Sequence, residues 1–461
     1  MIDLLITGGT VVTMDPQRRI ITDGAVAVDG GRILAVDKAA VVAAQYPAVR
    51  ETIDARGHLV TPGLIDGHNH PIHFLSKGIC DDQEYFFRSH HRVWPYEVSL
   101  TPDEAYFASL GSFAEMVHSG TTCFASPGDF YPLEVARAAN TVSIRGTIAR
   151  IGWDRHDPNA PERFNETWEE AAARGEEAAH AVNAAGGGRL RGWLSLVRSA
   201  HCSDRLCQEI KRRADRMGTM IHGHMCVLPG EAELSLRTFG ARSLERYRRL
   251  GVLGPNLYLV HMGWITDEEV DLVREHGVKV CHCPSASMLG GFGCITHGKF
   301  PELIAAGVTV ALGSDACAIS RFVDMVRVMY LAACAHKDVK HDPTVMGPHK
   351  AFEMCTIDGA RALGWDDEIG SLEPGKRADI AVFATDAIEW QPQPFATPVA
   401  NLVLSASGAA CRHVIIDGRV VMRDRRLLTI DLDAYLCDAA QRAPAILNRL
   451  NIPVAPAWPV V

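Results

Sequence analysis

The chain lacks the features that would place it in a membrane, on nucleic acid or outside the cell. Its 461 residues contain no run of about 18 apolar residues, so we expect no membrane-spanning helix. Basic residues are not in excess, because 46 Lys and Arg face 55 Asp and Glu and leave a net charge of −9. This balance argues against nucleic acid and anionic membranes as principal partners. The opening MIDLLITGGTVVTMD carries an early acid and no basic region, which is not typical of a signal peptide; we expect a cytoplasmic protein.

Paired cysteines, low-complexity segments and internal repeats are also missing. The 13 cysteines are an odd number and form no Cys-x-x-Cys pair, so most of them are expected to be small buried apolar residues. Cys226, Cys281 and Cys283 fall on predicted strands and could lie near a site, but core packing is the simpler interpretation.

What the chain does contain is a large hydrophobic fraction arranged in two different patterns. Hydrophobic residues make up 47% of the sequence, and the length suits one α/β barrel plus a smaller unit. Residues 1–60 alternate apolar and polar positions between Gly-Gly and Asp-Gly turns, which indicates hairpins. The same pattern returns within residues 366–461. We therefore predict a small β-sandwich formed by both chain ends, with a terminal helix.

Residues 61–365 alternate short apolar runs with helical patterns, as in a β/α barrel. A helix after Thr266 is marked by Glu269 three residues later, a capping box. The predicted fold class is thus α/β, a (β/α)8 TIM-like barrel with the terminal β-sandwich. The expected strands are 64–70, 121–126, 147–153, 192–199, 219–225, 257–263, 278–284 and 308–315.

Metal-ligand residues end four of these predicted strands. His68 and His70 are two apart and so point to the same face of the first strand. His224, His261 and Asp315 end the fifth, sixth and eighth strands. Because active sites of such barrels lie at the carboxyl ends of the strands, these side chains should converge. Neutral imidazoles with a carboxylate suit a divalent metal such as zinc.

Other histidines have weaker arguments. His222 shares the inward face with His224 but lies one layer deeper, so we expect a buried histidine or a partner that orients a ligand. His282 could contact substrate from the seventh strand or serve packing. The rest are expected to be structural, among them His58, His73, His90, His91 and His201.

Several motifs together resemble the amidohydrolase superfamily, and within it the enzymes similar to cytosine deaminase and chlorotriazine hydrolase. The resemblance covers nearly the whole chain. It rests on TPGLIDGHNHP, SGTTCF, IHGH, VHMGWITDEEVDLVREHGVKVCHCP, ELIAAGVTVALGSDA, CTIDGARALG and IGSLEPGKRADIAV, in that order.

The resemblance implies a ligand set and a metal count. It makes His68, His70, His224 and Asp315 the metal ligands, and it places His261 beside the metal-bound water. Relatives with two metals bridge them with a carbamylated lysine on strand 4. The sequence here, GWLSLVRS, offers no lysine. We therefore expect one divalent metal per subunit, zinc before iron, manganese or cobalt.

The sequence departs from the deaminases of this family at strand 5. Those enzymes carry His-x-x-Glu there, and the Glu moves protons to a ring nitrogen; here the third residue after His224 is Val227. Val197 and Arg198 stand where relatives often have a substrate histidine, and Ser287 replaces a common Asn. These features are more similar to phenylurea hydrolases and molinate hydrolase.

The expected enzyme is therefore a metal-dependent hydrolase of non-peptide C–N bonds. Metal-bound hydroxide would attack the sp² carbon of a small urea, amide or (thio)carbamate, with Asp315 moving the proton and His261 stabilising the oxyanion. Arg198 could grip a carbonyl or carboxylate, or form an outer ion pair. Glu231, beyond Pro229-Gly230, could replace the missing acid, but we do not expect it to.

Two alternatives stay open. The first is a deaminase of an aminated N-heterocycle such as a pyrimidine, purine or triazine, and the second is an inactive scaffold. The long loop after the first strand, with Trp94, and the stretch after the second, with Phe130, could line the pocket or belong to the core. We expect a small-molecule substrate, no nucleic acid or membrane partner, and a homo-oligomer.

Overall fold

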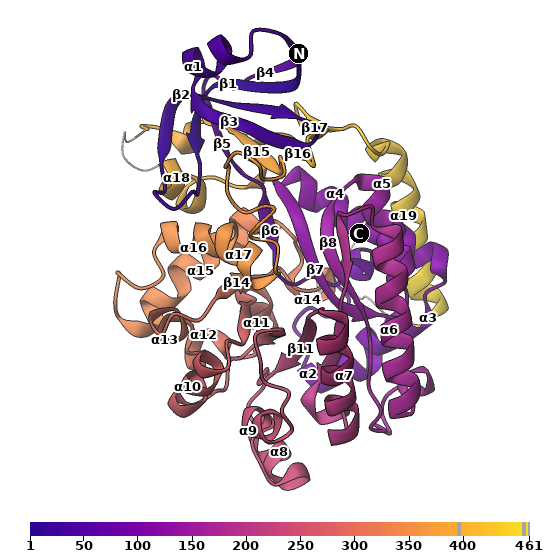
Figure 1. Ribbon diagram of the computed structural model, residues 1–461. Helices are drawn as coiled ribbons and strands as arrows, with labels where there is room; N and C mark the ends of the chain where they lie inside the picture. The colour runs from indigo at the N-terminus through magenta and orange to yellow at the C-terminus, as the bar shows by residue number, and fades with distance from the viewer. Residues whose placement is uncertain (394–397, 454–457, 460–461) are drawn as a thin grey trace.

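The computed structural model describes residues 1–393, 398–453 and 458–459, and it places a strand-rich unit beside a β/α barrel (Figure 1). Indigo and yellow-orange strands share the first unit, so the two chain ends meet there. The predicted fold class is confirmed: a parallel barrel with a mixed sheet from both termini.

Both chain ends contribute to one nine-stranded sheet. Its order is β18-β17-β16-β15-β5-β1-β2-β3, with β4 pairing to β1. Side chains alternate along β1, because Leu4 and Ile6 enter one hydrophobic cluster and the intervening Leu5 enters another. The first cluster also takes in Ile380 and Ile415 from the C-terminal strands. The strands are β1 Ile2–Val12, β2 Ile20–Asp29, β3 Arg32–Lys38, β4 Val49–Asp54, β5 His58–Pro62, β15 Ile380–Ala384, β16 Cys411–Ile416, β17 Arg419–Arg423 and β18 Arg426–Leu427.

The barrel strands follow the predicted order, and most are shorter than predicted, whereas β7 extends beyond 126 to Asp129. Four form one parallel sheet and five form another. Trp193 alone separates β9 from β10, so the fourth predicted strand is split. The strands are β6 Leu64–Asp66, β7 Thr121–Asp129, β8 Arg145–Arg150, β9 Leu190–Gly192, β10 Leu194–Arg198, β11 Ile221–Met225, β12 Leu257–His261, β13 Lys279–His282 and β14 Val310–Leu312.

Two glycines allow the first and last barrel strands to meet. The Gly67 amide donates to the Leu312 carbonyl over 2.8 Å, and the Asp315 amide donates to the His68 carbonyl over 2.8 Å. A Cβ on Gly67 would lie 2.8 Å from that Leu312 oxygen, and one on Gly313 would lie 2.7 Å from the His68 Cβ. Any larger residue would push β6 and β14 apart, and both strands lead directly into ligand-type residues.

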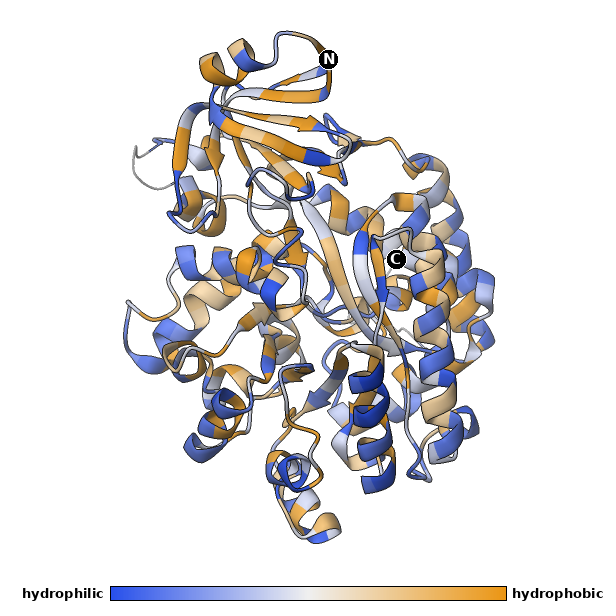
Figure 2. Ribbon diagram, viewed as in Figure 1, coloured by the Kyte–Doolittle hydropathy of each residue, from blue (hydrophilic) through white to orange (hydrophobic). Residues whose placement is uncertain are grey.

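The helices cover the outside of the barrel. Apolar colour concentrates in the strands and on the inner helix faces (Figure 2). Thr266 and Glu269 form the predicted capping box of α10. Among the described residues, no helix is long and apolar enough to cross a membrane. The helices are α1 Ala39–Gln45, α2 Tyr85–Arg88, α3 Trp94–Ser99, α4 Pro102–His118, α5 Pro132–Val142, α6 Trp168–Ala185, α7 Asp204–Met217, α8 Glu231–Phe239, α9 Ser243–Arg249, α10 Asp267–Glu275, α11 Pro284–Gly290, α12 Cys294–His297, α13 Phe300–Ala305, α14 Cys317–Ser320, α15 Met325–Lys340, α16 Pro348–Met354, α17 Ile357–Ala362, α18 Pro398–Leu404 and α19 Leu432–Arg449.

A buried ion pair ties the barrel to the nine-stranded sheet. Arg145 opens β8, and its guanidinium donates from Nε and Nη2 to the Asp379 carboxylate over 2.7 and 3.1 Å. The two side chains are 1% and 2% exposed. The Asp379 carboxylate also accepts from the Asp417 amide over 2.8 Å. A charge buried this deeply is tolerated only with its partner in place.

We predict that Asp379→Ala lowers the free energy of unfolding by about 3 kcal/mol, because the buried Arg145 guanidinium loses its closer carboxylate and keeps the Asp417 carboxylate at 3.5 Å. Chemical denaturation followed by circular dichroism measures the change. Arg212→Ala is the matched control, since its pair with Glu209 lies on the surface and should change stability little. Equal effects of the two substitutions would contradict the prediction.

Candidate metal centre

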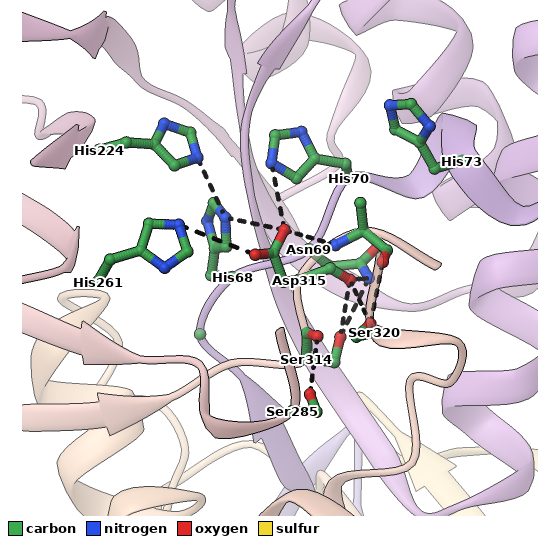
Figure 3. A network of polar contacts seen from close by, with 12 residues as sticks. His68, Asn69, His70, His73, His224, His261, Ser285, Ser314, Asp315 and Ser320 are labelled. Carbon is green, nitrogen blue, oxygen red and sulfur yellow. Dashed lines mark hydrogen bonds and ion pairs between the residues drawn. The ribbon is translucent and has the colours of Figure 1, made fainter. Parts of the chain in front are cut away.

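Five ligand-type side chains converge at the carboxyl ends of the barrel strands, as predicted (Figure 3). His68 and His70 follow β6, His224 lies in β11, His261 ends β12 and Asp315 follows β14. His261 and Asp315 adopt left-handed backbone conformations, with φ of 78° and 66°. Such angles are costly for residues other than glycine and occur preferentially at functional sites.

The donor atoms of these residues lie close together. Asp315 Oδ1 is 3.7 Å from the Nε2 atoms of both His68 and His70, and its Oδ2 is 3.8 Å from His261 Nε2. His224 Nε2 is 3.2 Å from His68 Nε2. Three groups have donors within 4.8 Å of one another: His68 with His224 and His261, His68 with His70 and Asp315, and His261 with Cys283 and Asp315.

Hydrogen bonds at the Nδ1 atoms orient two of the imidazoles, so that their Nε2 atoms face the centre. His224 Nδ1 lies 2.8 Å from the Val197 carbonyl oxygen, so Nδ1 carries the proton and Nε2 presents a lone pair. His68 Nδ1 lies 3.1 Å from Nε2 of the fully buried His222. His222 thus supports a ligand-type histidine from below, one of the two roles expected for it.

The donor set fits a divalent cation. When His68 Nδ1 donates to His222, the Nε2 atoms of His68 and His224 both present lone pairs across 3.2 Å. Two lone pairs at that separation repel unless a cation lies beside them, and the neighbouring Asp315 carboxylate would balance its charge. Imidazole nitrogens with one carboxylate are a common ligand set for zinc and related metals.

Burial sets the charge states of the cluster. It holds the pKa values of His68, His70 and His224 well below the usual range of histidine, and neighbouring histidines add to this. Burial, helped by Arg198, lowers the pKa of His261 to about 3. These imidazoles are therefore neutral at pH 7, the form in which histidine binds metals. Burial raises the pKa of Asp315 to about 6, although the hydrogen bond from the Ala316 amide and the charges of Arg88 and Arg198 lower it.

A buried network that sequence reasoning missed holds the two ligand segments together. Asp66 is fully buried, and its carboxylate accepts from the amides of His68 and Ser314 over 3.2 and 2.9 Å. Asn69 Nδ2 donates to Ser314 Oγ over 3.1 Å and to the Asp315 carbonyl over 2.9 Å. Within LIDGHNH, Asp66 lies two residues before His68 and Asn69 lies between the two histidines, and these positions were the available signal.

One pocket contains most of this centre. Its lining includes His70, His224, His261 and Asp315. Two of the five predicted substrate contacts, Arg198 and Trp94, also line it. The guanidinium of Arg198 donates to the hydroxyl of Tyr85, so it lies in the barrel mouth and not in an outer ion pair.

The lining of this pocket also includes His73, Glu97 and Val227. His73, expected to be structural, lies in the pocket with its Nε2 3.0 Å from Glu97 Oε1. Val227 also lines the pocket and is 3% exposed.

The other three predicted substrate contacts do not line that pocket. His282 stacks on Phe300 with ring centroids 3.8 Å apart, and its Nε2 lies 3.0 Å from His336 Nε2. Ser287 Oγ accepts from the Cys294 amide over 3.0 Å. The Phe130 ring packs on Phe164. His282 faces the α15 helix because successive strand residues alternate sides, a choice that the sequence alone left open.

Glu231 is closer to the centre than expected from the sequence. The chain turns after β11, and the Glu231 carboxylate accepts a 3.1 Å hydrogen bond from the Val227 amide. Glu231, His224 and Arg198 together line a second pocket, which shares its Arg198, His224 and Tyr85 walls with the first.

Known proteins match this chain over nearly its full length. Residues 59–421 match the amidohydrolase family, and residues 24–48 match an imidazolonepropionase-like composite domain of bacteria. A 5-methylthioadenosine/S-adenosylhomocysteine deaminase of Syntrophobacter fumaroxidans is 33% identical, over 94% of this chain and 96% of that protein.

Solved structures agree with this assignment. An adenosine deaminase of Xanthomonas campestris with bound zinc superposes with a TM-score of 0.89 at 28% identity, covering 97% of this chain and 99% of that one. The zinc complex of an atrazine chlorohydrolase of Arthrobacter aurescens gives a TM-score of 0.85 at 22% identity, with 96% and 100% coverage, and supports the fold alone. With its convergent histidines and aspartate, this chain belongs to the amidohydrolase family and is a metal-dependent hydrolase of C–N bonds.

Proposed function

We propose that the protein is an aminohydrolase that replaces the exocyclic amino group of a 6-aminopurine nucleoside with oxygen and releases ammonia. The observation that carries the proposal is the similarity, across nearly the whole chain, to relatives named as deaminases of adenosine-type nucleosides. Ring deamination was the alternative in the sequence analysis, and these relatives favour it over the hydrolysis of ureas and carbamates.

The proposed metal ligands are His68, His70, His224 and Asp315, with one ion per subunit. Their donor atoms are those that converge, and β9 and β10 carry no lysine that could bridge a second ion. When bound, a divalent ion such as zinc lowers the pKa of water to about 7 and so supplies a nucleophile at neutral pH.

Asp315 and His261 are the proposed catalytic pair. Asp315 accepts the proton of the attacking water and delivers it to the leaving amino group. His261 lies 3.8 Å from Asp315 and lines the pocket, so its neutral imidazole can donate to the oxygen that adds to the ring carbon.

A second candidate function is favoured by Val227. Its apolar side chain occupies the lining where the deaminases of this family have a carboxylate. Hydrolysis of a urea, amide or (thio)carbamate needs a proton only on the leaving atom, which Asp315 can return. Such a substrate would use the same metal, Asp315 and His261, with Arg198 holding its carbonyl group.

We predict that His224→Ala loses the metal while the wild type retains one equivalent. Mass spectrometry with elemental analysis of dialysed protein measures the content. A chelator should lower the free energy of unfolding of the wild type by about 2.7 kcal/mol when the free metal concentration was previously 100 times its Kd. The chelator should have little effect on the stability of His224→Ala. His180→Ala is the control, because that side chain is 64% exposed on α6. Two tightly bound equivalents, or full metal content in His224→Ala, would contradict the ligand assignment.

A substrate comparison separates the two candidate functions. We expect the metal-loaded wild type to release ammonia from adenosine, 5′-methylthioadenosine or S-adenosylhomocysteine, and His261→Ala to be slower by about 10²–10³ in kcat. The assay couples ammonia to a spectrophotometric readout and runs in parallel with amine release from phenylureas and carbamates. Amine release without any ammonia from the nucleosides would overturn the proposed function in favour of the second candidate.

A further inference from the structure

The turn after β11 is built so that a later carboxylate returns to the strand. Cys226 has φ of 54° and Gly230 has φ of 86°, so two of the five residues from 226 to 230 adopt left-handed backbone conformations. Glu231 then begins α8. Its carboxylate accepts the 3.1 Å hydrogen bond from the Val227 amide. The acid is thereby held against the backbone of the third residue after His224.

This position matters because ring deamination needs an acid there. When oxygen adds to C6 of a purine, electrons move onto the adjacent ring nitrogen, and that nitrogen requires a proton. Val227 is 3% exposed, lines the pocket of the metal centre, and has no proton to give. The deaminases of the family place a Glu side chain at this position.

Glu231 lines a hollow that adjoins the pocket of the metal centre. Glu231, His224 and Arg198 line one pocket. His224, Arg198 and Tyr85 also line the pocket of the metal centre, so the two hollows adjoin at these residues. Burial raises the pKa of Glu231, while Arg198 and three backbone amides oppose it. The net effect favours the protonated carboxyl compared with a glutamate in water.

We infer that Glu231 protonates the ring nitrogen in place of the residue at position 227. The inference rests on the proposed nucleoside deamination. As oxygen adds to the ring carbon, the Glu231 carboxyl proton passes to the ring nitrogen, where it stays as the N–H of the product. The C–N bond then breaks. One proton of the water leaves with ammonia through Asp315, and the other restores Glu231 by way of solvent.

The test is Glu231→Gln in the metal-loaded full chain, assayed on adenosine and on S-adenosylhomocysteine. A lost proton donor should lower kcat on both nucleosides by about 10²–10⁴, with KM changed by less than about threefold. Metal content and thermal stability should match those of the wild type. Glu233→Gln is the control, because Glu233 is exposed two residues further along α8 and should keep wild-type kinetics.

A relocation variant distinguishes a proton donor from a structural residue. Val227→Glu combined with Glu231→Gln returns a carboxyl to the third position after His224, and it should recover at least about tenfold of the kcat lost in the single variant. A contact that merely fixed the turn would not be restored by this exchange, because the carboxyl is now carried by residue 227 and no longer by the first residue of α8.

Three results overturn the inference. One is an unchanged kcat in Glu231→Gln. Another is an unchanged kcat with a raised KM for S-adenosylhomocysteine alone, which would make Glu231 a binding residue for the charged amino-acid tail. The third is a wild type that is inactive on every nucleoside, which removes the proposed function itself. Only the first two leave that function standing, so the two failures are distinguishable.

Discussion

The buried carboxylate of Asp66 is the contact on which the geometry of the site depends. It accepts from the amides of His68 and Ser314 and from the Ser314 hydroxyl, so it joins the first barrel strand to the last. Burial raises its pKa to about 7, while the bonds from Ser314 oppose this. Together with Gly67 and Gly313, this junction brings His68 and His70 within 3.7 Å of Asp315. The Asp315 amide, which donates to the His68 carbonyl, and the Asn69 side chain, which donates to the Asp315 carbonyl, reinforce the same junction.

The fold and the ligand-type residues could be predicted because each depends on a short local pattern. Alternating apolar positions specify strands, and a strand that ends in His68-x-His70 at a barrel mouth leaves those side chains few other directions. Strand lengths were less predictable. Trp193 interrupts the fourth strand, and beyond Asp66 the chain divides its backbone bonds, because Gly67 donates to Leu312 of β14 and Asn69 donates to Ala125 of β7.

The substrate side of the site was less predictable, for reasons that individual residues show. Trp94 and Arg198 line the pocket, whereas His282 turns to His336 on α15 and Phe130 packs on Phe164. Which side of a strand or loop faces the cavity depends on long-range packing that periodicity does not record. Glu231 was underestimated for a related reason. Its distance from His224 along the chain suggested separation, but two positive φ angles bring it back.

Val227 and Glu231 are best understood together. An apolar residue at the pocket wall would by itself favour substrates that need no acid at this point. The Val227 amide, however, fixes the carboxylate of Glu231, so the same residue that removes one acid positions another. Glu231 also begins a helix, where the backbone dipole favours the ionised form, whereas burial favours the protonated one. Burial outweighs Arg198 and the backbone amides, so the pKa of Glu231 lies above that of a glutamate in water. A glutamate at position 227 would not lie at the start of a helix, so its pKa would lack the lowering effect of the helix dipole. The turn therefore changes both the position of the acid and the factors that set its pKa.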